Sequence, residues 1–460
     1  MISLELRRGR GPGGPELHAD ATFPARDGAW ELALPCWRPG RYELGNFAQY
    51  LLALEALADD GTWHRLPKSA LHRWSVAPGL RRFRWRFHAG ILNAGSTCLG
   101  ADLFYINPVN CILFDPERTG LSFALALPDI PASWDVATGL PRGADGTFVA
   151  ADFDRLADAP LLAAPELWHR TYEEAGSVFH VWAYGAPPRE HDRFLDDHRR
   201  FTACMVGDFG GTFPEPAYHF LYLFPDLDVR HGVEHADSTV IVMGPPERVA
   251  TEEGHEELIS IASHELYHAW NVKRLRPAEW LPYDFERAVP SRLGYVAEGV
   301  TTYMGDLYLH ESGCIDTDAW LRRMNEFFRR HFSNPGRLNM SVADSGFDTW
   351  LDGYIAGVTG RKSSIYIEGA VLAFLCDVRI MQRSGGSASL QTAIASLHDR
   401  LVPAGLGVTE SLYWAALDAA AGAPGATADL RARFCDGCED TREEVEAAMK
   451  WMGRRFAPEG

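Results

Sequence analysis

Residues 263–271 read Ser263-His-Glu-Leu-Tyr-His-Ala-Trp-Asn271, and this stretch decides how the rest of the chain is interpreted. On a helix, His264 and His268 lie one turn apart on the same face, so both imidazoles can reach one metal ion. Glu265 lies about 100° further round the helix, where its carboxylate can hold a water molecule instead of the metal. The stretch therefore predicts a zinc site with two histidine ligands and a glutamate beside it.

The residues on either side predict a helix with defined ends. Acids in a first turn suit the positive end of the helix dipole, and cations suit its carboxyl end. The acids are Glu252, Glu253, Glu256 and Glu257, and the cations are Lys273, Arg274 and Arg276, followed by Pro277. We expect His255, which lies on a different face from the motif, to be a surface residue at the start of this helix.

A catalytic zinc needs three protein ligands and one open position. The longer motif that adds a third histidine six residues on is excluded, because Asn271 and Arg274 hold the positions that glycine and histidine would need. Glu298 lies in residues 293–310, where apolar residues recur at helical spacing, and two antiparallel helices can bring it to the metal. The alternative is that both histidines are ordinary surface or core residues and that Glu298 is a solvated helix acid.

The composition is that of a globular protein with two or three domains. The 460 residues carry 44 basic and 62 acidic side chains, a net charge of −18, which argues against nucleic acid as a partner. No apolar run is long enough to span a membrane, and the first residues lack a signal core, so we expect a cytoplasmic protein without a membrane partner. The eight cysteines are too sparse for a disulfide scaffold, and we expect Cys435 and Cys438 to lie in a loop, not in a second zinc site.

The distribution of patterns along the chain predicts an α+β multidomain fold. In residues 82–87 aromatic residues alternate with arginines, as in a strand with one buried face, and residues 1–170 as a whole read as an antiparallel β domain. Residues 171–250 are β-rich with one helical segment near 191–205. Residues 251–460 are mainly helical, and Thr441 with Glu444 predicts a capping box for the last helix.

Several stretches resemble the glycyl aminopeptidase family of gluzincin zinc metallopeptidases. The stretches are Leu34-Pro-Cys-Trp-Arg-Pro-Gly-Arg-Tyr42 with residues 46–50, His264 to Pro277, Glu298-Gly-Val-Thr-Thr-Tyr303, Ile365-Tyr-Ile-Glu-Gly-Ala370, and His231-Gly-Val-Glu-His235. The family combines a β domain with a thermolysin-like catalytic domain and usually a PDZ domain. The resemblance implies that residues 171–460 form the catalytic domain, and we expect no PDZ domain after about residue 440.

The resemblance also implies roles for two residues that no local pattern singles out. Tyr366 matches a catalytic tyrosine that donates its hydroxyl to the oxyanion, and Glu234 matches a glutamate that binds the free amine of the substrate. The alternatives are a packed tyrosine and an edge-strand acid. Three positions depart from the family pattern and leave residue preference open: His231, the pair Ala236-Asp237, and Glu368.

Together these features predict an aminopeptidase with one zinc ion per chain, held by His264, His268 and Glu298. Glu265 is the expected general base, and the expected substrates are peptides with a free N-terminus and a small first residue such as glycine or alanine. A zinc endopeptidase or oligopeptidase is one alternative, and a zinc-containing peptide-binding protein without catalysis is another. The physiological substrate, the oligomeric state and the role of the N-terminal domain stay open.

Overall fold

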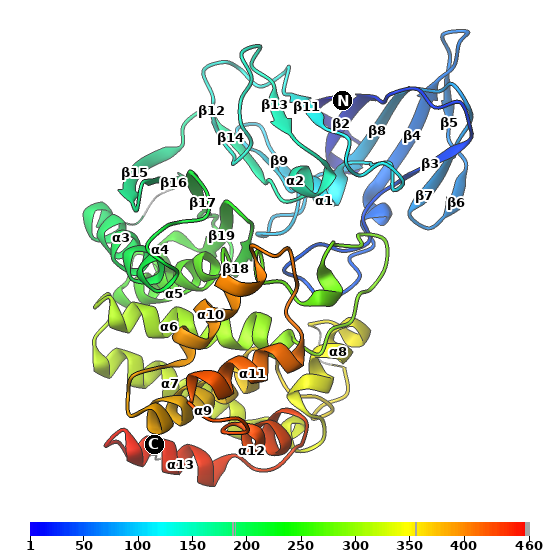
Figure 1. Ribbon diagram of the computed structural model, residues 1–460. Helices are drawn as coiled ribbons and strands as arrows, with labels where there is room; N and C mark the ends of the chain where they lie inside the picture. The colour runs from blue at the N-terminus through cyan, green and yellow to red at the C-terminus, as the bar shows by residue number, and fades with distance from the viewer. Residues whose placement is uncertain (186–187, 189, 355–356, 456–460) are drawn as a thin grey trace.

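The computed structural model describes residues 1–185, 188, 190–354 and 357–455. Figure 1 shows three parts: a group of N-terminal sheets at the top, a five-stranded sheet below them, and a mainly helical region at the bottom. The predicted α+β fold is confirmed. The domain boundary at residue 170 stays a prediction, although strand β15 begins close to it, at Trp168.

The N-terminal part consists of three sheets and three short helices. The seven-stranded sheet has the order β13-β11-β1-β2-β8-β4-β5, the four-stranded sheet β12-β14-β10-β9, and the three-stranded sheet β3-β7-β6. The strands are β1 (Ile2–Gly11), β2 (Gly14–Thr22), β3 (Trp30–Ala33), β4 (Leu51–Leu57), β5 (Trp63–Arg65), β6 (Lys68–Ala70), β7 (Arg73–Val76), β8 (Arg82–His88), β9 (Cys98–Leu99), β10 (Phe104–Ile106), β11 (Phe123–Ala126), β12 (Asp135–Ala137), β13 (Phe148–Ala150) and β14 (Leu161–Ala164), and the helices are η1 (Phe47–Tyr50), α1 (Pro108–Cys111) and α2 (Phe153–Ala157).

The alternation seen in the sequence sets the faces of the seven-stranded sheet. In β8 the aromatic residues Phe83, Trp85 and Phe87 are buried, and the arginines between them are exposed. The pairing is antiparallel except between β1 and β11, which are parallel. The expectation of an antiparallel domain is therefore correct for every described pair of this sheet but one.

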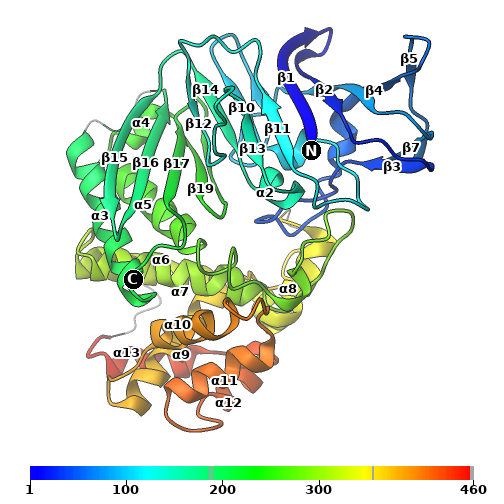
Figure 2. The same ribbon diagram turned by 45° about the horizontal axis from the view of Figure 1, so that its top comes forward.

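The five-stranded sheet is mixed and has the order β15-β16-β17-β19-β18, with β18 at its edge. Its strands are β15 (Trp168–Glu174), β16 (Ser177–Tyr184), β17 (Ala217–Leu223), β18 (Val229–Glu234) and β19 (Ser238–Gly244), and helices α3 (His191–Asp208), α4 (Pro246–Val249) and α5 (Glu252–Tyr267) pack beside it. Figure 2 shows the helices on one side of the sheet. On the other side Leu221 and Val240 pack against residues of the four-stranded sheet, which explains why β19 is buried along its whole length.

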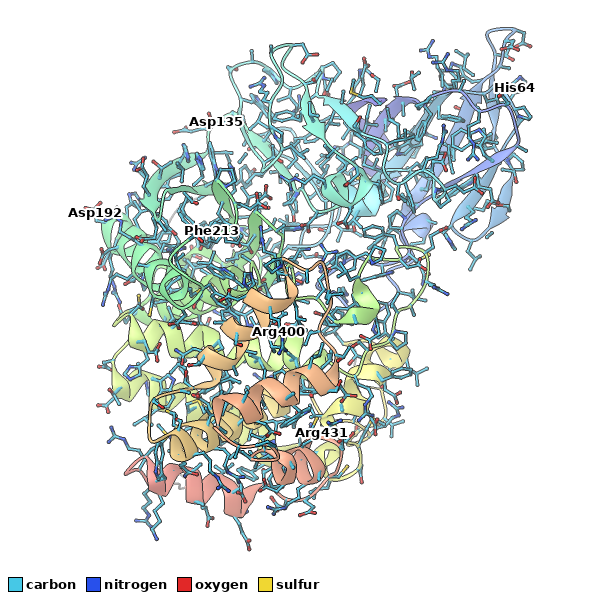
Figure 3. The ribbon with its side chains drawn as sticks, viewed as in Figure 1. His64, Asp135, Asp192, Phe213, Arg400 and Arg431 are labelled. Carbon is cyan, nitrogen blue, oxygen red and sulfur yellow. The ribbon has the colours of Figure 1, made fainter. Side chains whose placement is uncertain are left out.

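The helical part follows α5. It contains η2 (Ala278–Trp280), the π-helical segment η3 (Tyr295–Val300), α6 (Thr301–Glu311), α7 (Thr317–Ser333), η4 (Pro335–Leu338), α8 (Val342–Asp352), α9 (Ile367–Ser384), α10 (Leu390–Leu401), α11 (Glu410–Ala420), α12 (Ala428–Leu430), η5 (Arg431–Cys435) and α13 (Arg442–Trp451). In Figure 3, His64 lies at the outer end of the N-terminal sheets and Arg431 lies near the opposite end of the molecule.

Two local predictions in this part are wrong. The capping box at Thr441 is absent, because the Thr441 hydroxyl lies 2.6 Å from His331 Nε2 on α7 and makes no bond to its own helix. His255 is buried, not at the surface, and its Nε2 lies 2.8 Å from the Asp197 carboxylate on α3. In both cases a polar side chain bonds a residue on another helix, and sequence spacing does not predict which helices contact each other.

Among the described residues, no helix is both long enough and apolar enough to cross a lipid bilayer.

Candidate metal centre and active-site cleft

Helix α5 presents the two histidines, and its ends follow from local chemistry. Thr251 caps the start, where its hydroxyl accepts a hydrogen bond from the Gly254 amide, and Glu252 begins the first turn. The helix ends at Tyr267, earlier than the positions of the cations predict. Arg274 does bond a carbonyl at this end, that of Ala269, at 2.6 Å, whereas the Lys273 side chain turns away into the interior.

The structure brings together the three side chains expected to bind the metal. The Nε2 atoms of His264 and His268 lie 3.1 Å apart, and Glu298 Oε2 lies 3.5 Å and 3.4 Å from them, respectively. Bonds of 2.0–2.1 Å at tetrahedral angles place neighbouring ligand atoms about 3.3 Å apart. The three atoms therefore match three corners of a zinc coordination tetrahedron, and two imidazoles with one carboxylate form a donor set that suits zinc.

Two of the three expected ligands, His268 and Glu298, are each oriented by a second hydrogen bond. His268 Nδ1 donates to the Asn271 carbonyl at 2.8 Å, which leaves Nε2 free for a metal. The Tyr42 hydroxyl donates to Glu298 Oε1 at 2.6 Å and leaves Oε2 facing the histidines. Asn271 Nδ2 in turn donates to the Val296 carbonyl at 2.8 Å, so the loop after α5 is tied to the π-helical segment that carries Glu298.

The electrostatics of the centre favour a cation. Burial alone would lower the pKa of His268, but nearby carboxylates, above all that of Glu298, outweigh it and raise this pKa to about 10. Glu234 and Glu265 supply further negative charge, and their oxygens form a second compact group with His268, within 4.8 Å of one another. Negative charge concentrated in a buried site attracts a divalent ion.

Glu265 has the environment of a general base. Its Oε2 is buried and has no hydrogen-bond partner among the described residues. Burial is the main cause that raises the pKa of Glu265 well above its usual value, and the Glu234 carboxylate adds to this effect. Gly232 on β18 passes so close that a Cβ there would lie 2.2 Å from Glu265 Oε1, so a larger residue at this strand position would displace the Glu265 carboxylate.

Glu234 ends the edge strand β18 and is almost fully buried. Its Oε1 has no partner among the described residues, and a loop of the N-terminal part covers it at Gly40. A Cβ on Gly40 would lie 2.3 Å from Glu234 Oε2, and Gly40 also has a φ of +79°, so glycine is favoured there for two reasons. An unpaired buried carboxylate beside a metal centre is suited to bind a substrate ammonium.

Tyr366 directly precedes α9 and lines the same cleft. Its ring centroid is 6.5 Å from that of His264 and 6.3 Å from that of Tyr354. Burial and the negative charge of Glu298 raise the pKa of Tyr366 well above its usual value, so its hydroxyl stays protonated and can donate a hydrogen bond.

The cleft has a volume of about 480 Å³ and is built by both halves of the chain. Arg38, Gly40 and Arg41 come from the N-terminal part, and strand β18 and helices α5, α6 and α7 supply most of the rest. Burial lowers the pKa of Arg38, and the negative charge of Glu234 opposes this effect. No local pattern in the sequence indicates a role for Arg38 or Tyr42, although both lie in the stretch 34–42 that resembles the family.

The second possible zinc site, at Cys435, offers no vacant donor set. Ligand atoms of Cys435, Glu410 and Asp436 lie within 4.8 Å of one another. However, the Arg292 guanidinium already binds Glu410 at 3.1 Å and Asp436 at 2.7 Å. Cys435 ends η5 and Cys438 follows it in a turn region, so the loop expected there begins one residue later than predicted.

Comparisons with known proteins agree with this geometry. Residues 257–372 match the family model described as M61 glycyl aminopeptidase, and residues 14–165 match that of the peptidase M61 N-terminal domain. No curated protein matches the chain.

Two solved structures illustrate the shared fold. An aminopeptidase N family protein from Idiomarina loihiensis superposes with a TM-score of 0.87 at 24% identity, over 97% of this chain and 78% of that one. An M1 zinc metallopeptidase from Deinococcus radiodurans has a TM-score of 0.52 at 18% identity, over 94% and 92% of the two chains. At these identities the likeness concerns the fold alone.

Proposed function

This chain belongs to the M61 glycyl aminopeptidase family, since the two family matches together cover more than half of its length, and on that premise we propose that it is a zinc-dependent aminopeptidase. The observation that carries the proposal is the convergence of His264, His268 and Glu298 at tetrahedral ligand distances. A zinc ion held there supplies a Lewis acid that polarises the peptide carbonyl and lowers the pKa of a water molecule.

The protein's own groups provide the proton transfers. Glu265, with an unpaired buried oxygen and a raised pKa, accepts a proton from the attacking water and delivers it to the leaving amine. Tyr366 donates its hydroxyl to the oxygen that becomes negatively charged in the transition state. These roles need the two residues on the cleft wall, and both line it.

Glu234 is the proposed anchor for the substrate's free amine. Its carboxylate lies at the end of β18, beside Glu265 and His268, so an ammonium bound there holds the first peptide bond near the metal centre. Arg38 and the Gly40 loop cover this end of the cleft, which supports a preference for small first residues such as glycine or alanine.

The central test is Glu265→Gln. We expect the variant to keep one zinc ion per chain and to lose about 100- to 10,000-fold in kcat on an alanyl peptide. Elemental analysis and a chromogenic aminoacyl substrate measure the two quantities. Undiminished turnover would remove Glu265 from the mechanism, and bound zinc without turnover in the wild type would favour the zinc-containing peptide-binding protein.

A second experiment separates an aminopeptidase from an endopeptidase. A short alanine peptide and its N-acetylated twin are compared at equal concentration. Because acetylation removes the charge that Glu234 binds, we expect cleavage of the acetylated peptide to be at least about 100-fold slower. Equal cleavage of both peptides would instead support an endopeptidase or oligopeptidase.

A further inference from the structure

The cleft continues beyond the metal centre, away from Glu234. Along the edge strand β18, Glu234, Gly232 and Arg230 alternate onto one face, and all three line the cleft. Four steps of 3.2–3.4 Å separate Glu234 from Arg230, or roughly 13 Å. Residues that follow the first peptide bond of a bound substrate would therefore extend toward Arg230.

The wall opposite this end of β18 is also basic. Helix α7 presents Arg323, Phe327 and Arg330, at helical spacing, to the cleft. Arg323 is already neutralised, because its Nε lies 2.8 Å from the Asp306 carboxylate on α6. Ser260 on α5 donates a hydrogen bond to the same carboxylate at 2.9 Å. The charge of Arg323 is therefore already paired within the wall of the cleft.

Arg230 and Arg330 are different, because neither has an acidic partner within ion-pair distance among the described residues. Both side chains are exposed and line the cleft from opposite elements, the strand and the helix. In a chain with 62 acids against 44 basic residues, two unpaired arginines in one cleft are not a consequence of general composition. Guanidinium groups bind carboxylates through paired, charge-assisted hydrogen bonds.

We propose that Arg230 and Arg330 form a subsite for a carboxylate on the leaving part of the substrate. The inference rests on the proposed function, because Glu234 as the amine anchor sets the direction of the bound peptide. An extended peptide covers at most about 3.3–3.6 Å per residue, so the C-terminal carboxylate of a peptide of three or four residues reaches the arginines. An aspartate or glutamate side chain near the scissile bond offers the same chemistry.

The test uses binding, so that it does not depend on turnover. Dissociation constants are measured by calorimetry on the zinc-loaded Glu265→Gln protein for two peptide pairs. Ala-Ala-Ala with a free or amidated C-terminus tests the terminal carboxylate, and amidated Ala-Glu-Ala with amidated Ala-Gln-Ala tests the side chain. We expect about tenfold or tighter binding of the carboxylate member in at least one pair.

Substitutions then assign the effect. Arg230→Gln and Arg330→Gln, each added to Glu265→Gln, should bring the ratio of dissociation constants toward one. Arg329→Gln is the matched control, because this neighbouring exposed arginine pairs with Glu326 and does not line the cleft. It should leave the ratio unchanged, and circular dichroism verifies that each variant is folded.

The outcomes separate the two claims. Ratios near one for both pairs, or ratios that survive both cleft substitutions, overturn the subsite, as does a failure of every peptide to bind. If the ratios behave as expected but the wild type cleaves no peptide, the subsite stands and the aminopeptidase proposal fails.

Discussion

Tyr42 gives the third proposed metal ligand its orientation from a distant part of the chain. Its ring stacks on Trp280 with a centroid distance of 4.6 Å, and its hydroxyl fixes one carboxylate oxygen of Glu298. A carboxylate held in this way loses less freedom when it coordinates a metal. The N-terminal part therefore contributes to the metal centre as well as to the cleft wall.

The variant Tyr42→Phe tests this contact at the residue scale. It keeps the stacked ring and removes only the hydrogen bond, so we expect zinc affinity to fall by about 10- to 100-fold with little loss of stability. Competition with a chromogenic chelator measures the affinity. Tyr50→Phe is the control, since Tyr50 packs on Phe87 in the same domain and does not contact the metal centre; equal affinities for both variants would contradict the role of Tyr42.

The residues that could be predicted from the sequence are those whose relation is local. His264 and His268 are one helical turn apart, so their spacing alone places both imidazoles on one face. Tyr42 and Glu298 are separated by 256 positions, and no periodicity relates them. Glu234 and Tyr366 could be predicted only from the family resemblance, because no local pattern in the sequence indicates them.

At the scale of elements, the crossing of η3 and α9 sets the distance between Glu298 and Tyr366. Gly299 and Gly369 meet at this crossing, where a Cβ on Gly299 would lie 2.4 Å from Gly369 Cα. The obstacle is backbone, so no side-chain rotation relieves it. Two glycines therefore allow the helices to approach closely enough for the side chains of Glu298 and Tyr366 to face one cleft.

Gly299→Ala is expected to force this crossing apart. We predict a loss of about 1–3 kcal/mol or more in the free energy of unfolding, together with weaker zinc binding, because the adjacent residue is Glu298. Urea titration and chelator competition measure the two effects. Gly207→Ala is the control in an exposed turn of α3 with no neighbour within 4 Å; there alanine should be neutral or stabilise by up to about 1 kcal/mol.

Helix and strand positions were predicted more accurately than the contacts between elements. The apolar stripe of α7 at Trp320, Met324 and Phe328 is buried as its spacing indicates. Thr441 illustrates the opposite case, because the capping pattern is present in the sequence and His331 on another helix takes its hydroxyl. The hydroxyl bonds a residue that is distant in the sequence in place of the backbone of its own helix, and sequence spacing does not indicate such a partner.

At the scale of the whole molecule, Asp158 links the N-terminal part to both sides of the cleft. Its carboxylate accepts from Lys273 Nζ at 2.7 Å and from the Ala236 amide at 2.8 Å, and lies 3.1 Å from His235 Nδ1. Burial would raise the pKa of Asp158, but the buried Lys273 ammonium outweighs this effect and holds the pKa well below its usual range. One side chain thus fixes the loop after α5 and the turn that follows Glu234.

Asp158→Ala leaves the Lys273 charge buried without a partner. We expect this to cost about 3–5 kcal/mol in the free energy of unfolding, measured by urea titration at neutral pH. Asp154→Ala is the matched control, because Asp154 lies on the same α2 segment but pairs with Arg276 at 3.6 Å in a half-exposed position, where about 0–1 kcal/mol is expected. Similar losses for the two variants would show that the buried Asp158–Lys273 pair contributes no more to the free energy of unfolding than the half-exposed pair does.

The contribution of Arg38, Gly40 and Arg41 to the cleft wall also has a consequence during biosynthesis. These residues leave the ribosome early, whereas Glu298 follows much later and Tyr366 later still. A nascent chain that has not yet released its last third holds only fragments of the reaction centre. The proposed reaction centre is therefore complete only after the segment that carries Tyr366 has been synthesised.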